Sequence, residues 1–167
     1  MRRCSYDWSE SSVKGHKETE DNLALRPGIM ETGMTITGEC FCGKVKYQID
    51  GKLHDARSCH CSRCRKAFSA QASAYALVEP RQFKWCAGEN LLTSYVGKHG
   101  FGLQFCSRCG STLCGTFDGA VHGITLGCLN DDPEIEIGRH IYVGSRARWE
   151  VMPEGVLQFE KGAPEDA

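Results

Sequence analysis

Cys40-Phe41-Cys42-Gly43 and Cys106-Ser107-Arg108-Cys109-Gly110 are two cysteine pairs of similar form in the two halves of this sequence. Each pair follows a strand-like segment and is followed at once by glycine, which tolerates positive φ and lets a backbone amide point at a sulfur. Two such pairs far apart in sequence are typical of a zinc ribbon, in which four sulfurs surround one ion. We therefore predict a closed, structural zinc site. The alternative, a redox dithiol at Cys106 and Cys109, would need no second pair.

A denser cluster, Cys59-His60-Cys61-Ser62-Arg63-Cys64-Arg65-Lys66, lies between the two pairs. Its thiolates can bind one ion and leave a fourth position open, which is where zinc does chemistry. The basic residues Arg63, Arg65 and Lys66 favour deprotonated thiols and would attract an anionic substrate. In an extended Cys-His-Cys segment the His60 side chain points away from its neighbours, so we expect it not to be a ligand. A second closed site, completed by Cys86, Cys114, Cys128 or a histidine, is the alternative.

The remaining cysteines stand alone, and an isolated cysteine in a β segment is usually a small buried hydrophobic residue. The total of 11 cysteines is odd, and no secretory signal is visible, so a disulfide framework is not expected. These features predict a reducing compartment and a cytoplasmic location. We assign no chemistry to the isolated cysteines, which are Cys4, Cys86, Cys114 and Cys128.

Composition excludes several classes of function. The formal net charge is −1, and no basic stripe alternates with aromatic residues, so nucleic acid is not an expected partner. No apolar run reaches the roughly 18 residues that a membrane-spanning helix needs. Hydrophobic residues make up 41% of the chain, which is close to the globular average and enough for one ordinary core.

The chain divides into two parts. Residues 1–33 are polar and lack an amphipathic period, so we expect a flexible N-terminal tail there and one zinc-binding domain over 34–167. Alternating or β-branched segments, often bounded by glycine, predict an all-β domain with little helix. A short turn or helix is expected over 62–68. The expected strands lie at 44–50, 73–78, 82–85, 92–96, 102–105, 121–126 and 139–143.

Three motifs together resemble one known family. Gly38-Glu39-Cys40-Phe41-Cys42-Gly43-Lys44-Val45-Lys46-Tyr47, the Cys59 to Lys66 cluster, and Phe105-Cys106-Ser107-Arg108-Cys109-Gly110-Ser111 are similar to the glutathione-dependent formaldehyde-activating enzymes. That family also contains centromere protein V. The similarity continues through Gly127-Cys128-Leu129-Asn130-Asp131-Asp132-Pro133, His140-Ile141-Tyr142-Val143 and Trp149, so it covers roughly 36–150. Any one motif alone would be unspecific, whereas their order and spacing are specific.

The resemblance implies a tent-like, antiparallel β fold built on the zinc knuckle pair. It implies a structural zinc at Cys40, Cys42, Cys106 and Cys109, and a catalytic zinc at Cys59, Cys61 and Cys64. The family activity is a carbon–sulfur lyase reaction that joins glutathione to formaldehyde, so we expect this chain to join glutathione, or another small thiol, to formaldehyde or a similar small aldehyde. Arg63, Arg65 or Lys66 would hold a glutathione carboxylate, and His60 or His99 would move a proton.

Two alternatives to this enzyme are a non-catalytic zinc module on the same scaffold and a thiol enzyme of the methionine-sulfoxide reductase type using Cys114 or Cys128. One departure from the family pattern is Ser69, at a position where the family commonly has glycine after its Arg-Lys pair. This substitution bears on the backbone near the second metal, and therefore on substrate choice more than on metal binding.

Overall fold

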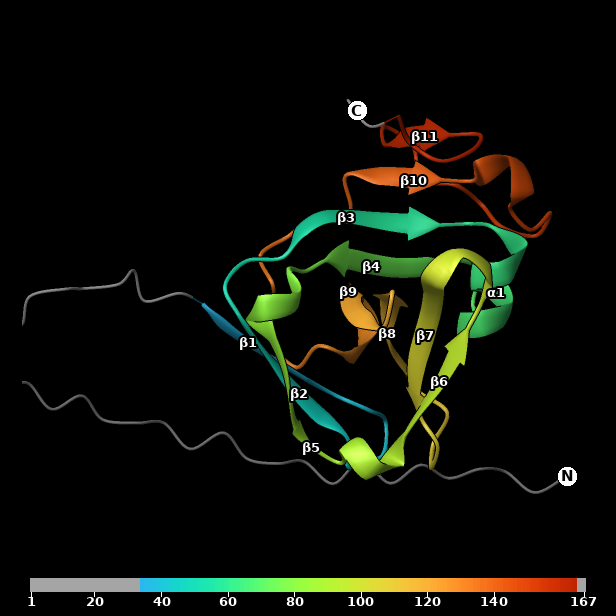
Figure 1. Cartoon of the computed structure of the whole chain (residues 1–167). Coiled ribbons are helices and arrows are strands. Elements are labelled where there is room, and N and C mark those ends of the chain that lie inside the picture. Colours follow the sequence, from blue (N-terminus) through green and yellow to red (C-terminus); the bar gives the residue numbers. More distant parts are fainter. Residues whose placement is uncertain (1–33, 165–167) are drawn as a thin grey trace, which may run out of the picture. The chain divides into compact units, whose positions relative to one another are not determined.

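Eleven strands in two sheets form the framework of residues 34–164, the part of the chain that this computed structural model describes (Figure 1). The prediction of an all-β fold with little helix is confirmed. The single α-helix of this range, α1 (Ser62–Phe68), lies where it was expected. The tail predicted over 1–33 falls outside the described residues.

The smaller sheet has the strand order β1-β2-β5 and is antiparallel throughout. Its strands are β1 (Thr35–Glu39), β2 (Lys46–Asp50) and β5 (Phe83–Ala87). Strand β2 alternates as a half-buried strand should, with Tyr47 and Ile49 buried and their neighbours facing outward. The turn between β1 and β2 carries the first cysteine pair.

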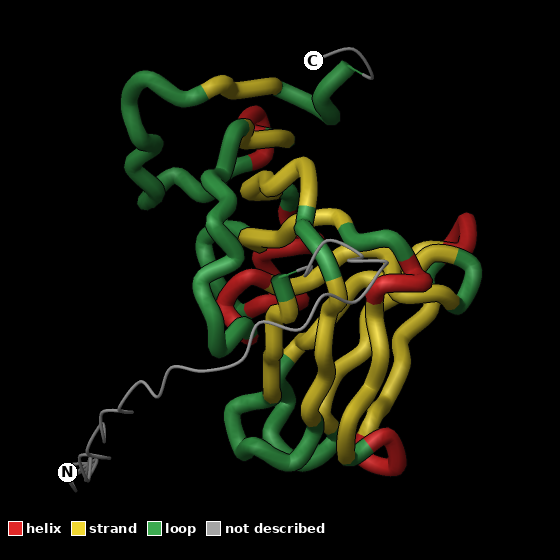
Figure 2. The backbone as a smooth tube through the Cα atoms, turned by 90° about the vertical axis from the view of Figure 1, so that its left-hand side faces the viewer, coloured by secondary structure: helices red, strands yellow, loops and turns green. Residues whose placement is uncertain are grey.

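The larger sheet has eight strands in the order β11-β10-β3-β4-β9-β8-β7-β6. Figure 2 shows its longer strands running side by side. Its members are β3 (His54–Cys59), β4 (Ser73–Leu77), β6 (Leu92–Val96), β7 (Phe101–Cys106), β8 (Thr112–Phe117), β9 (Ala120–Thr125), β10 (Arg139–Ile141) and β11 (Leu157–Phe159). Strands β1, β3, β8 and β11 were not among the predicted segments.

Strand β10 departs from the antiparallel pattern, because it runs parallel to both of its neighbours, β3 and β11. Parallel neighbours require a crossover connection, and the long stretch of chain from β3 to β10 supplies one. As a result, a late segment of the sequence lies beside the strand that ends at Cys59, where Ile141 is its partner.

Buried side chains from both sheets form one core. Ile36, Tyr47 and Ile49 come from the smaller sheet, and Leu113 and Ile124 from the larger one. Buried Cys40 and Cys106 belong to the same cluster, so the cysteine pairs are anchored in the core. Within the described range no helix has the length and apolar character needed to span a membrane.

Candidate metal centres

The first cysteine pair sits in a tight turn between β1 and β2. Gly43 has φ +67°, and its N–H donates to the Cys40 carbonyl oxygen at 2.8 Å. The N–H of Val45 donates to Cys40 Sγ at 3.3 Å, which is the amide-to-sulfur contact expected of a zinc knuckle. Gly110, with φ +78°, closes the second pair in the same way by donating to the Cys106 carbonyl oxygen at 2.8 Å.

The two turns bring four sulfurs together, and we call this group the four-cysteine cluster. Cys42 Sγ lies 3.5 Å from Cys40 Sγ and 3.9 Å from Cys106 Sγ. Sulfurs bonded to one tetrahedral zinc at about 2.3 Å would stand roughly 3.8 Å apart, so the donor set fits that ion. The Phe41 N–H donates to Ser111 Oγ at 2.9 Å and links the turns directly. The members of the cluster are Cys40, Cys42, Cys106 and Cys109.

A three-cysteine cluster (Cys59, Cys61 and Cys64) lies where β3 passes into α1. Cys59 is the last residue of β3, and Cys61 caps the N-terminus of α1, where its sulfur accepts the N–H of Cys64 at 3.4 Å. All three sulfurs lie within 4.8 Å of one another. Among the described residues, no histidine or carboxylate joins this group at the same distance.

The three sulfurs already favour a negative charge. A hydrogen bond from the Cys64 thiol lowers the pKa of Cys59 to about 6, and the same contact raises the pKa of Cys64. A thiolate held between two further sulfurs is a soft donor set, which suits a cation such as zinc. The three-cysteine cluster therefore fits a metal ion bound by three protein ligands.

Two of the three predicted basic residues line a shared groove. This basic groove has a volume of about 390 Å³ and lies against α1. Arg65 Nη2 also donates to the Ser145 carbonyl oxygen at 3.3 Å, which orients its guanidinium. Arg63 lies elsewhere, since its Nη2 is beside Gly97 in the loop after β6. The groove is lined by Arg65, Lys66, Ser69, Ala70, Gln71 and Trp149.

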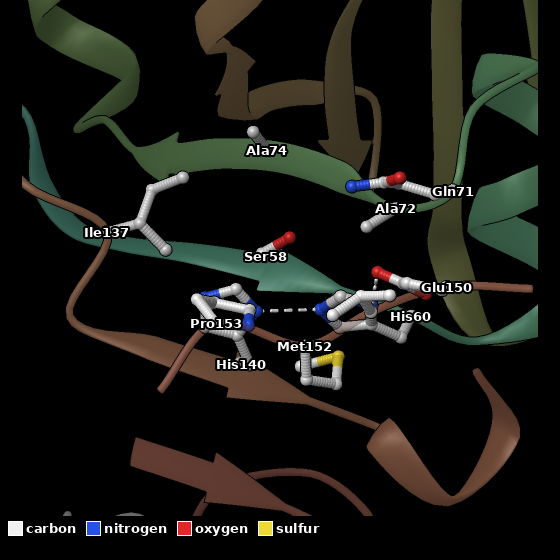
Figure 3. Close-up of a pocket in the computed structure, with 11 residues that line it drawn as sticks. Ser58, His60, Gln71, Ala72, Ala74, Ile137, His140, Glu150, Met152 and Pro153 are labelled. Atoms are coloured by element: carbon white, nitrogen blue, oxygen red, sulfur yellow. Dashed lines mark hydrogen bonds and ion pairs between the residues drawn. The ribbon is translucent and has the colours of Figure 1, made fainter. Parts of the chain in front are cut away.

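His60 lies between two buried polar partners that sequence reasoning did not assign to the site. Its Nε2 is 2.8 Å from His140 Nδ1, and its Nδ1 is 2.8 Å from Glu150 Oε1 (Figure 3). The second contact is a close approach and not a well-directed hydrogen bond. We call these three residues the histidine array. It forms part of the wall of a cavity of about 530 Å³, which shares Gln71 with the basic groove.

No local sequence signal links the members of this array, because Glu150 and His140 are remote from His60 in the chain. Sequence reasoning placed His140 in the expected strand at 139–143 and gave it no role at the site. His99, the other suggested proton carrier, is exposed in a short loop with φ +63° and lines neither cavity.

The isolated cysteines take no part in either cluster among the described residues. Burial raises the pKa of Cys114 to about 12 and that of Cys128 to about 11, so both thiols are poor nucleophiles. These values argue against a thiol enzyme built on either residue. Cys86 is exposed, so the expectation that it is buried was wrong. Cys4 lies outside the described residues.

The fold and the two cysteine clusters define an all-β domain with sites suited to metal ions. The family model described as "Glutathione-dependent formaldehyde-activating enzyme" matches residues 35–145, and the chain belongs to this family. A search of curated proteins returned no match. The crystal structure of a Rhodobacter sphaeroides protein is similar at 23% sequence identity and a TM-score of 0.47, covering 74% of this chain and 98% of that one.

Proposed function

We propose that this protein is a zinc-dependent carbon–sulfur lyase that joins glutathione, or another small thiol, to formaldehyde or a similar small aldehyde. The family supports the general type of activity. The observation that carries the proposal is the division of the clustered sulfurs into a group of four and a group of three. Four sulfurs complete a tetrahedral site, whereas three leave one position for a substrate.

The two clusters would have different roles. The four-cysteine cluster would hold a structural zinc that joins β1 and β2 to the end of β7. The three-cysteine cluster would hold the catalytic zinc, which, when bound, lowers the pKa of a thiol in its fourth position toward neutrality. Because these ligands must stay reduced, we also infer a cytoplasmic location.

The basic groove would position the thiol substrate. Glutathione carries two carboxylates, and Arg65 and Lys66 would each bind one with a charge-assisted hydrogen bond. Exposed Trp149 supplies an apolar surface on the same groove for the substrate backbone. Arg63 would contribute through its charge alone, since its guanidinium lies by Gly97.

A non-catalytic zinc module is the second candidate, and one observation favours it. Neither the basic groove nor the cavity beside the histidine array includes Cys59, Cys61 or Cys64 in its wall. An enzyme needs its open metal position to face a space that the substrate can enter. The rate test below separates the two candidates.

The test uses zinc-loaded protein, glutathione and formaldehyde, with the rate of adduct formation followed by mass spectrometry against a protein-free control. We expect the parent protein and Cys86→Ser, an exposed cysteine outside both clusters, to accelerate the reaction equally. Cys61→Ser should lose this acceleration and one zinc per chain while keeping its fold. A parent protein that binds zinc at both clusters but gives no acceleration with any thiol and aldehyde of a panel would favour the module.

A further inference from the structure

We propose that Glu150 and His140 are positioning residues that hold His60 away from the three-cysteine cluster and so keep the fourth metal position free for substrate. The inference rests on the proposed function, since it assumes a metal bound by that cluster. It adds a role for two residues that come from the C-terminal part of the chain.

His60 is the natural competitor for the open position. It lies between Cys59 and Cys61 in sequence, so it is the histidine nearest along the chain to a metal that these two residues would bind. An imidazole nitrogen is a good zinc ligand, and three cysteines with one histidine form a common closed site. A closed site would be structural and would have no room for a thiol.

Both nitrogens of the His60 ring lie close to other polar groups. Nε2 lies 2.8 Å from His140 Nδ1, and Nδ1 lies 2.8 Å from Glu150 Oε1. The two imidazole rings stack with centroids 5.0 Å apart. The His60 backbone is held as well, because its N–H donates to the Ile141 carbonyl oxygen at 2.9 Å. These contacts therefore restrain both the ring and the backbone of His60.

These three polar side chains are buried, so placing them in the core costs free energy of desolvation. His60, Glu150 and His140 are 1%, 8% and 9% exposed. Burying a carboxylate and two imidazoles requires their desolvation, and apolar side chains of equal volume would often be as stable or more so. An orienting role accounts for this polar array better than stability does. Residues that orient the surroundings of a metal in this way are a regular part of metal sites.

The same C-terminal segment also reaches the basic groove. Trp149, which precedes Glu150, lines that groove together with Arg65 and Lys66. Gln71 lines both the groove and the cavity at the histidine array. One segment therefore places a wall of the proposed substrate groove and restrains the competing ligand.

The test is zinc X-ray absorption on the fully loaded full-length protein, with glutathione as the probe. We expect the parent spectrum to show no imidazole scattering and to gain sulfur scattering when glutathione is added. Glu150→Ala and His140→Phe should each gain the scattering of one imidazole per chain and lose the response to glutathione. The double variants His60→Ala/Glu150→Ala and His60→Ala/His140→Phe should lose the imidazole signal again. Glu154→Gln, an exposed acid near Glu150, should behave as the parent.

Each outcome decides between the proposals. Imidazole scattering in the parent would show a closed site and overturn both the inference and the proposed enzyme. An open parent site that remains open in both single variants would overturn the inference and leave the proposed function intact. If both single variants lose zinc and native circular dichroism, the array is a folding element and the inference is likewise overturned.

Discussion

The ring of Tyr47 lies against the backbone of Gly38, its cross-strand partner in the β1–β2 pair. A Cβ atom at Gly38 would stand 2.2 Å from Tyr47 Cζ. The ring cannot retreat, because Phe83 and Trp85 pack on it with ring centroids 5.4 and 5.9 Å away. Glycine is therefore required here to let the strand that leads into the first cysteine pair meet the core.

Gly38→Ala should accordingly lower the free energy of unfolding by about 1–3 kcal/mol, the usual range for overpacking a filled core. Urea denaturation of the zinc-loaded protein measures this change. Gly127→Ala is the matched control, since nothing lies within 4 Å of a Cβ atom at that position. Equal stability of the two variants would show that the contact carries no strain.

Ser69 ends α1 in the left-handed conformation, with φ 49° and ψ 38°. Glycine adopts this conformation without strain, whereas other L-residues lose roughly 1–2 kcal/mol there. After the larger entropy of glycine in the unfolded chain is subtracted, Ser69→Gly should raise the free energy of unfolding by about 0.5 kcal/mol. Ala70→Gly, one position later and outside the positive-φ set, should lower it. The idea fails if Ser69→Gly is the less stable of the two.

The four-cysteine cluster should be essential for folding. Cys106 is fully buried in the core, and its cluster joins segments that are remote in sequence. Structural zinc contributes on the order of 10 kcal/mol, so Cys106→Ser or a chelator should unfold the domain, as followed by circular dichroism. Cys61→Ser should keep the native spectrum. Unfolding by both substitutions to the same extent would mean that the two clusters share one structural role.

The basic groove should distinguish charged from neutral thiols. Arg65→Ala removes one charge-assisted hydrogen bond to a carboxylate, which is worth about 1.5–3 kcal/mol. The KM for glutathione should therefore rise roughly tenfold or more, while the KM for 2-mercaptoethanol should not change. Arg63→Ala is the comparison, because Arg63 lies outside the groove. A similar rise in KM for the neutral thiol would contradict carboxylate binding by Arg65.

Asp131 ties the loop after β9 to β1 by accepting the backbone N–H and the hydroxyl of Thr37, both at 2.7 Å. These bonds hold the pKa of Asp131 below its usual 3.8. A lowered pKa in the folded state adds stability above about pH 4, and this contribution is lost as the pH falls through the folded-state pKa. The parent should therefore be more stable than Asp131→Asn at pH 7, and the difference should shrink below pH 4 in urea titrations. A difference independent of pH would contradict this linkage.

The sequence predicted the cysteine clusters because their ligand chemistry is local. Each cysteine pair lies within one turn, and the positive φ of Gly43 and Gly110 follows from the same few residues. Strand β3 was missed because Asp55, Arg57 and Ser58 are polar and give this segment no apolar alternation. In the structure Asp55 pairs with Arg57 of the same strand and with Arg139 of β10, so its charge is neutralised inside the sheet.

The surroundings of the three-cysteine cluster could not be predicted in the same way. His140 and Glu150 meet His60 only because β10 lies parallel to β3, and a pairing of that kind depends on the whole sheet. Trp149 faces the basic groove for the same reason. Short-range patterns identify the cysteine clusters, whereas the groups that surround them come together only in the tertiary structure.

The position of Cys106 and Cys109 late in the sequence has a consequence during synthesis on the ribosome. A nascent chain has only Cys40 and Cys42 of the four-cysteine cluster until residues 106–109 have emerged. Strand β3 likewise lacks its parallel neighbour until β10 has been synthesised. Such non-local closure is slow, so we expect the thiols of Cys40 and Cys42 to stay accessible to oxidants until the second pair has emerged. We therefore expect this protein to be most sensitive to thiol oxidation before the two cysteine pairs have come together.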